Sequence, residues 1–402
     1  MLTQAENELL TQVGAGTPMG ELLRRYWHPV AAESDLDQDP VRPVRLLGES
    51  LTLFRTEGGE LGLIGERCAH RGISLAYGIP QENGLRCAYH GWTYNKEGQV
   101  VDMPFEPACL PLKITGYPVE ALGGLIFAYL GPEPVPYLPR WDVLVREDFK
   151  KTCRITELPC HWLQCMDNSL DPTHFEHLHG AYGNYAMQRL GKPPMLNNQK
   201  HIKIDFDLFE YGIYKRRLLA GQSEDVADWT KGTPILFPNI LAGVAIDGSA
   251  GYQFRVPVDD SHSLNINYNC ASLSPGEQPG GKLVVRHEPL QYDEAGRVVS
   301  TYVTRQDEMA WVAQGAISDR TTEHLATSDK GILLYRKVIL ENIERVQRGE
   351  DPMAVIRDYE VNFPMIAIDR RSTLDAFKVG VTENLGGPGY FFDERELERS
   401  QA

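Results

Sequence analysis

Two short segments of the chain each carry one cysteine and one histidine. Cys68 and His70 stand in the first segment, and Cys87 and His90 stand in the second. A zinc site can use two thiolates and two imidazoles, but zinc fingers usually pair Cys with Cys and His with His. One Cys and one His on each loop suit a two-iron cluster, in which one iron takes both thiolates and the other takes both imidazoles. A glycine follows each histidine within two positions. Glycine turns let backbone amides approach the sulfurs, so four unrelated side chains are a weaker explanation.

A second group of metal ligands lies in residues 168–179, which hold three histidines and two acids. Non-haem iron(II) that activates dioxygen takes two neutral imidazoles and one carboxylate and keeps other positions open. The chain must therefore select two of its three histidines. Helix geometry alone would pair His174 with His177, one turn apart.

The composition sets limits on partners and location. The 402 residues are enough for two domains, and the net charge of −15 argues against nucleic acid or an anionic membrane surface as the main partner. An anionic small substrate is still compatible with this charge. No apolar run approaches the ~20 residues needed to span a bilayer, and the N-terminus lacks the features of a signal peptide. Seven cysteines, without the spacing of a secreted disulfide framework, predict a cytoplasmic protein.

The elements around the first ligand group are predicted to be short strands. Thr17 and Pro18 predict the start of a helix over 19–26. From about Val41 onward, short apolar runs separated by turns predict a small all-β module that ends in a strand at 125–130. A proline-rich stretch follows at 131–139 and predicts a domain boundary.

The elements around the second ligand group mix helices with long strands. Apolar and polar residues alternate over 202–208, which predicts a half-buried antiparallel strand. Residues 252–256 and 263–268 repeat this pattern. Ser328 is predicted to cap a helix that runs over 329–348 and stops at Gly349. The predicted fold class is α+β. It comprises an N-terminal helical segment (1–40) packing on the catalytic domain, the all-β module (41–140), and a catalytic domain (141–402) with an antiparallel sheet covered by helices.

The first ligand group resembles that of the Rieske proteins. Respiratory Rieske subunits carry an additional cysteine in each loop, and these two cysteines form a disulfide. The corresponding positions here are Ile73 and Tyr89, which cannot form this bridge. The resemblance therefore implies a Rieske [2Fe–2S] domain with a potential toward the negative end of the roughly −150 to +300 mV span of such centres. A low potential suits a donor chain that starts at a nicotinamide, as in the oxygenase branch.

The second ligand group resembles the D-x2-H-x4-H segment of Rieske non-haem iron oxygenases. The resemblance assigns His174 and His179 to the mononuclear iron and leaves His177 off it. It also makes Asp171 an inter-subunit bridge for electrons, with His90 as the Rieske partner, although an acid before a proline is also a good helix cap. Five residues of a regular α-helix rotate by about 140°, so both histidines can bind one iron only if the helix ends or bulges between them. We therefore predict a distorted helix here.

Two more segments carry the resemblance. Residues 306–311 resemble the D-x3-W segment of the same oxygenases and make Asp307 the predicted carboxylate ligand. Glu308 is the competitor, and either acid is also compatible with an ordinary solvated helix face. Residues 315–329 resemble the phthalate-dioxygenase-like group in particular. Asn168 is a further candidate catalytic residue. The resemblance implies that the chain is an alpha (oxygenase) subunit with a helix-grip, START-like catalytic domain.

The implied activity uses O2 and electrons from a separate NAD(P)H reductase of the flavin and ferredoxin type. The implied reaction is hydroxylation or O-demethylation of an aromatic substrate, such as a phthalate-like, phenoxybenzoate-like or methoxylated aromatic acid. The chain has no convincing nucleotide fingerprint of its own. The resemblance also implies a homotrimer. Arg216, in the basic run 215–217, offers a guanidinium for a substrate carboxylate, or else this run is a solvated strand end.

Two alternatives are a Rieske-type electron carrier and a zinc-binding module without oxygenase activity. The 250 residues beyond the first module argue against the carrier.

Overall fold

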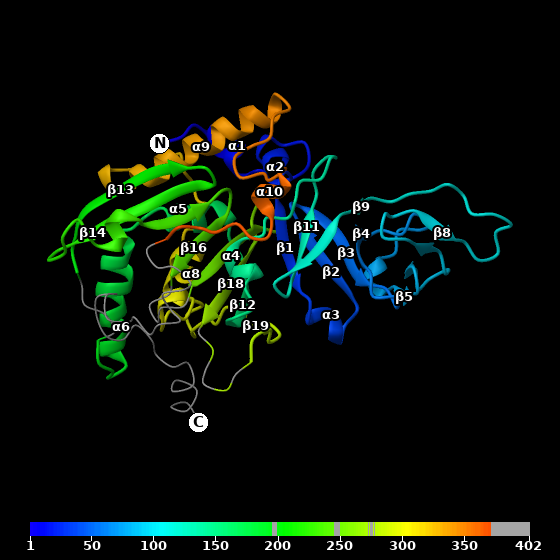
Figure 1. Ribbon diagram of the computed structural model, residues 1–402, viewed down its shortest axis with the longest axis horizontal. Helices are drawn as coiled ribbons and strands as arrows, with labels where there is room; N and C mark the ends of the chain where they lie inside the picture. Colours follow the sequence, from blue (N-terminus) through cyan, green and yellow to red (C-terminus); the bar gives the residue numbers. More distant parts are fainter. Residues whose placement is uncertain (195–198, 245–249, 272, 274–275, 277, 371–402) are drawn as a thin grey trace.

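The computed structural model describes residues 1–370 apart from 195–198, 245–249, 272, 274–275 and 277. Figure 1 shows an elongated molecule, in which a narrow part made of short strands extends from a wider part built on one large sheet. Helices lie almost entirely in the wider part. The predicted α+β class is confirmed.

Two four-stranded antiparallel sheets form the narrow part and support both cysteine segments. Cys68 follows one strand and Cys87 follows another, so each cysteine lies on a turn at a strand end. Both pack into a small core of their own with Phe54, Leu85 and Tyr94. The first sheet comprises β2 (Val41–Leu46), β3 (Glu49–Arg55), β4 (Leu61–Gly65) and β9 (Gly116–Tyr117), and the second comprises β5 (Ile79–Gln81), β6 (Gly84–Arg86), β7 (Thr93–Tyr94) and β8 (Val100–Asp102).

Residues 1–40 contain helices and also one strand. The predicted helix start is confirmed, because α2 (Pro18–Leu23) begins at Thr17, whose hydroxyl accepts the Gly20 N–H; the helix ends three residues earlier than predicted. Residues 27–32 form β1 (Trp27–Ala32), which the helical expectation missed. Because β11 is fully buried, its backbone N–H and C=O groups need hydrogen-bond partners on both sides. β1 supplies them on one side and β10 on the other. The remaining elements here are α1 (Gln4–Thr11), α3 (Asp35–Gln38), β10 (Val119–Leu122) and β11 (Leu125–Tyr129).

The wider part is built on an eight-stranded sheet of order β13-β14-β15-β16-β17-β18-β12-β19. Neighbouring strands are antiparallel except β12 and β19, which are parallel. The predicted antiparallel sheet is confirmed, and one edge pair is parallel because the chain turns back after β18 and forms β19 on the far side of β12. The strands are β12 (Lys150–Leu158), β13 (His201–Phe209), β14 (Gly212–Leu219), β15 (Thr233–Leu236), β16 (Ile240–Val244), β17 (Ala250–Pro257), β18 (Ser263–Ala271) and β19 (Val284–His287).

The predicted strand at 202–208 is confirmed as β13, but its burial differs from the prediction. Because β13 is an edge strand, Ile202 and Leu208 are 57% and 53% exposed. The central Phe206 is covered, since a Cβ on Gly331 would lie within 2.3 Å of its ring. The inner face of β13 is therefore the face that carries Phe206.

Three helices cover the sheet and carry or support the second ligand group. α5 (Trp162–Ser169) contacts β17 and α8 (Val303–Val312), while α9 (Lys330–Gln347) contacts α2 and β13. Figure 1 shows α9 beside β13. Asp329 occupies the N-cap of α9, so the predicted cap at Ser328 is wrong; Ser328 lies in a preceding 3-10 turn. Gly349, at φ +77°, follows the end of α9 as predicted. The shorter helices are α4 (Asp142–Val145), α6 (Gly183–Arg189), α7 (Ala227–Thr230) and α10 (Tyr359–Asn362).

The domain boundaries at 40 and 140 stay predictions, and residues 371–402 of the expected catalytic domain lie outside the described residues. Among the helices that the structure describes, none combines the length and the apolar character needed to cross a bilayer.

Candidate metal centres

The two cysteine loops have the same backbone hydrogen-bond pattern. In each loop the cysteine N–H donates to the residue five positions later, and the cysteine carbonyl accepts from a glycine four positions later. The glycines stand at φ +73° and +76°, a region that other residues rarely adopt. The bonds are Cys68 N to Ile73 O (3.0 Å), Gly72 N to Cys68 O (2.8 Å), Cys87 N to Trp92 O (2.8 Å) and Gly91 N to Cys87 O (3.1 Å). The two turns therefore have the same backbone hydrogen bonding around their cysteines.

The four predicted cluster ligands divide into a buried pair and an exposed pair. Cys68 and Cys87 are each 3% exposed. His70 and His90 are exposed, and their ring centroids lie 4.5 Å apart. Trp92 stacks on His70 at 4.7 Å. Two inner thiols and two outer imidazoles fit a [2Fe–2S] cluster with one sulfur-bound and one histidine-bound iron.

Tyr94 is an additional residue of this site that the sequence did not single out. Its hydroxyl lies 3.1 Å from Cys68 Sγ and accepts the Ala69 N–H at 2.9 Å. Burial and the neighbouring Cys68 sulfur raise the pKa of Tyr94, which keeps the phenol protonated and able to donate. All seven cysteines are free. The sulfurs of this site are therefore supported by hydrogen bonds rather than by a disulfide.

The predicted distorted helix is confirmed at the second ligand group. Residues Phe175–Tyr182 form a π-helix (η2) directly after His174. Its hydrogen bonds join residues five apart, so positions i and i+5 share one face. His174 and His179 therefore project to the same side, while the side chain of His177 is 75% exposed.

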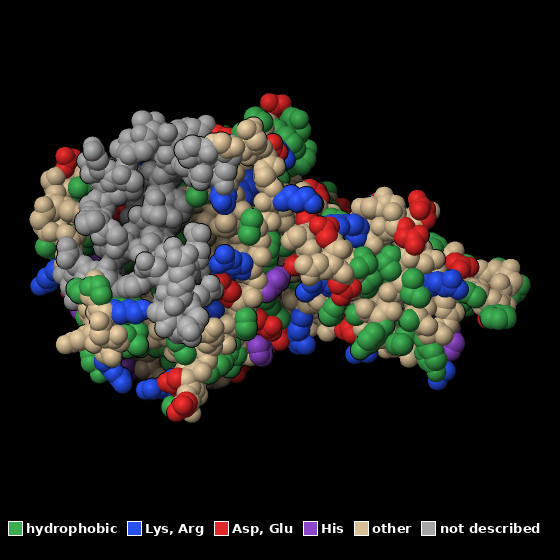
Figure 2. Space-filling model, turned by 90° about the horizontal axis from the view of Figure 1, so that it is seen from below, with side chains coloured by type: hydrophobic (Ala, Val, Ile, Leu, Met, Phe, Trp, Pro, Cys, Tyr) green, Lys and Arg blue, Asp and Glu red, His purple; other side chains and the backbone are tan. Residues whose placement is uncertain are grey.

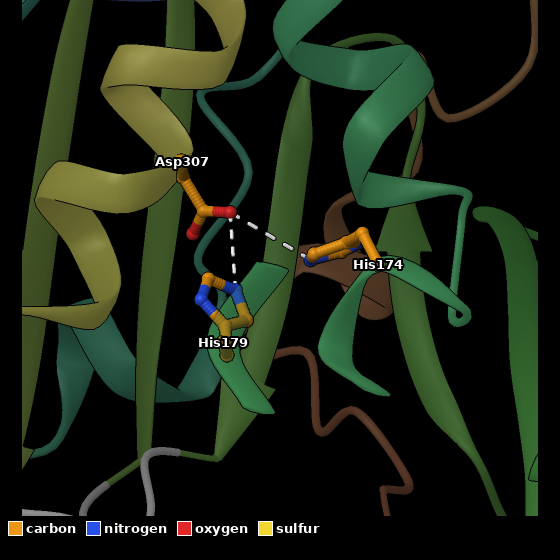
Figure 3. Close-up of side chains that lie close together, drawn as sticks. All are labelled: His174, His179 and Asp307. Atoms are coloured by element: carbon orange, nitrogen blue, oxygen red, sulfur yellow. Dashed lines mark ion pairs between the residues drawn. The ribbon is translucent and has the colours of Figure 1, made fainter. Parts of the chain in front are cut away.

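Asp307 on α8 faces these two histidines (Figure 3). Asp307 Oδ1 lies 3.2 Å from His179 Nε2 and 3.6 Å from His174 Nε2. One ligand atom from each residue lies within 4.8 Å of the others. His179 Nε2 and Asp307 Oδ1 are buried and make no hydrogen bond with the described residues. Two imidazole nitrogens and one carboxylate oxygen, converging without other partners, fit a mononuclear iron(II).

The charges of this site favour a carboxylate facing two imidazoles. Burial alone would raise the pKa of Asp307, but His179 and His174 outweigh it and the net direction is down. Burial would lower the pKa of His179, whereas Asp307 and a hydrogen bond with Gln306 raise it; Lys215 opposes them.

The other ring nitrogens of both histidines also face polar partners. His179 Nδ1 lies 2.9 Å from Gln306 Oε1, and His174 Nδ1 lies 3.6 Å from Asp171 Oδ2. Asp171 also accepts the backbone N–H groups of Thr173 and His174, as a helix cap does. Asp171 thus serves as a cap while standing against a candidate iron ligand, a position that is compatible with the predicted bridge.

Glu308 and Asn168 are not part of the three-residue cluster. Glu308 is fully buried and pairs with Arg154 at 2.8 Å and Arg305 at 2.7 Å. Neither acid of α8 lies on a solvated face, so that alternative is wrong for both. The backbone carbonyl of Asn168 accepts the Asp171 N–H at 3.0 Å, and a catalytic role for its side chain stays a prediction.

The basic run on β14 is divided between the two faces of the sheet. Arg216 pairs with Asp207 and donates to backbone carbonyls of α7, so its guanidinium is engaged away from the metal ligands. Lys215 points to the opposite face because strand side chains alternate. Arg217 also pairs with α7, through Asp228 at 3.3 Å. Lys215 is 8% exposed, and the Arg217 guanidinium lies 4.8 Å from the ring centre of Phe175, which follows His174. Lys215, which the sequence could not separate from Arg216, is therefore the cation nearer the site.

Comparisons with known proteins cover most of the chain. A model of the Rieske [2Fe-2S] domain matches residues 26–118, and a model described as LigXa C-terminal domain like matches residues 296–369. The oxygenase subunit of 5,5'-dehydrodivanillate O-demethylase from Sphingobium sp. (strain NBRC 103272 / SYK-6) is 39% identical over 386 residues, covering 93% of this chain and 89% of the relative. The oxygenase subunit of phthalate 4,5-dioxygenase from Pseudomonas putida is 31% identical over 399 residues, covering 87% and 88%.

Solved structures share the fold. Pseudomonas putida CBB5 NdmA superposes with a TM-score of 0.58 at 20% identity, covering 82% of this chain and 93% of that one. The chain belongs to the Rieske non-haem iron oxygenases and is an oxygenase (alpha) subunit. Proteins of this family use a Rieske [2Fe–2S] cluster, a mononuclear iron and O2, and the predicted enzyme class is thereby confirmed. The alternatives of an electron carrier or a zinc module are not favoured.

The Tyr94 hydroxyl gives a testable prediction for the cluster. Tyr94→Phe is expected to lower the reduction potential by about 40 mV, equivalent to about 1 kcal/mol, because a hydrogen bond to sulfur stabilises the more negative reduced state. A spectroelectrochemical titration measures this shift. Tyr77→Phe, at a 74% exposed tyrosine of the same module, is the matched control. An unchanged or higher potential in Tyr94→Phe would contradict the assignment.

Proposed function

We propose that this oxygenase acts on an aromatic carboxylate, which it hydroxylates or O-demethylates. The observation that carries the proposal is Lys215, a cation that is only 8% exposed and lies opposite Phe206 on the inner face of the sheet. Relatives support an aromatic acid: the phenoxybenzoate dioxygenase alpha subunit of Ectopseudomonas oleovorans is 35% identical over 372 residues. Phthalate and 5,5'-dehydrodivanillate, which two further relatives are named for, are also aromatic acids.

The proposed iron ligands are the two histidines that the π-helix brings together and the carboxylate that faces them. His174, His179 and Asp307 would hold iron(II), and Cys68, His70, Cys87 and His90 would hold the cluster. Bound iron supplies the open coordination positions at which O2 is activated. The chain supplies position and burial: the ligand side chains of His174, His179 and Asp307 are only 12%, 0% and 17% exposed.

The ligand assignment predicts which variants lose iron. His174→Ala, His179→Ala and Asp307→Ala should each lose the mononuclear iron and keep the cluster, because one donor of three is removed from a site far from the cysteine loops. Metal analysis together with the visible absorption of the cluster measures both. His177→Ala is the matched control in the same segment as the two histidines, and it should retain full iron. Loss of iron in His177→Ala would contradict the assignment of the iron ligands.

Lys215 is proposed to bind the substrate carboxylate. Lys215 lies directly opposite Phe206 on the neighbouring strand, so the two share one face of the sheet. That face is the inner one, because the Phe206 ring lies against Gly331 of α9 and near the Leu170 carbonyl at the end of α5. Arg217, two positions along the same face, reaches Phe175 beside the iron ligand His174. A carboxylate at Lys215 would therefore hold an aromatic ring on the iron side of the sheet.

The proposed function predicts a substrate profile. With a reductase and NAD(P)H, oxygen uptake should couple to product formation for aromatic acids and not for the corresponding carboxamides. Oxygen uptake and product identification across phthalate-like, phenoxybenzoate-like and methoxylated acids measure this preference. Equal turnover of acids and carboxamides, or turnover of neither, would contradict the proposal.

The same assay tests Lys215 against its neighbour. Lys215→Gln should raise KM for the acid by about 10- to 100-fold, because a charge-assisted hydrogen bond is worth about 1.5–3 kcal/mol. Arg216→Gln, on the opposite face of the same strand, is the control and should behave like the unmodified enzyme. An unchanged KM for the acid in Lys215→Gln would remove Lys215 from the proposal.

Electron supply and assembly are further parts of the proposal. A separate NAD(P)H reductase of the flavin and ferredoxin type is proposed as the donor; a carbazole 1,9a-dioxygenase oxygenase of the same fold has been solved in complex with a ferredoxin.

The narrow end of the molecule exposes apolar side chains (Figure 2), including Tyr77, Tyr89 and Phe105. We propose that a neighbouring copy covers part of this end in a homotrimer and that Asp171 passes electrons across the contact from His90. Sedimentation coupled to assay should show that only the trimer is active, and fully active monomers would contradict this.

A further inference from the structure

Gln306 is a buried amide next to the proposed iron site, and neither the motifs nor the comparisons assign it a role. Its side chain is fully buried, one position before Asp307 on α8. Its Oε1 lies 2.9 Å from His179 Nδ1, the ring nitrogen that does not face Asp307. Gln306 therefore contacts one proposed iron ligand through its side chain and is adjacent in sequence to another.

We infer that Gln306 is a positioning residue that holds His179 in the tautomer able to bind metal. A neutral imidazole carries one proton, and a metal needs the lone pair of the other nitrogen. If Nδ1–H donates to Oε1, the lone pair is on Nε2, which faces Asp307 Oδ1 at 3.2 Å. If the amide were reversed, its NH2 group would face Nδ1 and place the proton on Nε2, where it would block the metal. The orientation of one amide thus decides whether His179 can act as a ligand.

The surroundings of the amide indicate what holds this orientation. Gln306 Nε2 is buried and makes no hydrogen bond with the described residues, so the bond to His179 is the interaction that fixes the amide. Gly183, at the start of α6, leaves the space for it: a Cβ there would lie 3.1 Å from Nε2 and 3.5 Å from Oε1. Gln306 and Gly183 therefore form one packed unit against the π-helix.

The test measures metal binding and needs no substrate, so it is independent of the proposed aromatic acid. It rests on the proposed ligand set, for which His179→Ala serves as the reference that loses iron. Apoprotein lacking only the mononuclear iron is titrated with iron(II) under anaerobic conditions. The visible absorption of the cluster and the thermal melting curve report folding. The EPR spectrum of the nitric oxide adduct of the ferrous site, recorded with the cluster oxidised, reports ligand geometry.

Three variants separate hydrogen bonding from packing. Gln306→Met keeps the volume but loses the acceptor, and it should weaken iron binding by about 10- to 100-fold and change the EPR spectrum. Gln306→Glu keeps an acceptor and should bind iron within threefold of the unmodified protein. Gln314→Met, at an exposed glutamine just after α8, is the matched control and should change nothing.

The outcomes decide between the claims. Unchanged affinity and spectrum in Gln306→Met, or Gln306→Glu as weak as Gln306→Met, would overturn the role of Gln306. Retention of iron by His179→Ala would instead overturn the ligand set. If Gln306→Met does not fold, Gly183→Ala decides: its methyl group presses on the amide and should shift the spectrum and weaken binding, and an unchanged protein would overturn the inference.

Discussion

The catalytic half of this enzyme depends on a local change of helix type. Two histidines five residues apart point in different directions on an α-helix, and here they converge because residues 175–182 adopt π-helical hydrogen bonding. Asp171 accepts the backbone N–H groups of Thr173 and His174 just before this segment, and Gly183 just after it packs against Gln306 of α8, the helix that brings Asp307. A π-helix has poorer packing than an α-helix, so its persistence here requires that tertiary contacts over-determine it. The contacts from α8 supply part of that constraint.

Polar partners around the ligands divide into two groups with different physical tasks. Gln306 hydrogen-bonds the outer ring nitrogen of His179 and orients that ring, while Asp171 lies 3.6 Å from the outer ring nitrogen of His174. Glu308, the next residue of α8, does not belong to the candidate iron site. It is buried and forms ion pairs with Arg154 and Arg305. Removing one member of such a set leaves an uncompensated buried charge, which is why α8 is expected to tolerate little movement. The helix that carries the Asp307 carboxylate is therefore held in place by the buried ion pairs of Glu308.

The sequence was enough to propose ligand residues, whereas their surroundings needed the structure. Cys68, His70, Cys87 and His90 follow from residue type and spacing, and the need for a distorted helix followed from the five-residue interval between His174 and His179. The choice of Asp307 over Glu308 needed the family pattern, because two adjacent acids on a helix are equivalent until the partners of each face are known. Tyr94, Gln306 and Lys215 were missed or left unresolved, since their roles depend on contacts between segments distant in sequence. Strand β1 and the parallel edge pair β12–β19 were missed for the same reason. An edge position also explains why Ile202 and Leu208 are exposed despite their alternating pattern.

The central claim is that one chain carries two separate iron centres, the second of which is built by the π-helix. Diffraction from crystals of the iron-loaded protein, collected at the iron absorption edge, tests this claim most directly. The account predicts one anomalous feature between Cys68, His70, Cys87 and His90 and a second, distant peak between His174 Nε2, His179 Nε2 and Asp307. A map without the second peak, or with that peak on His177, would contradict it.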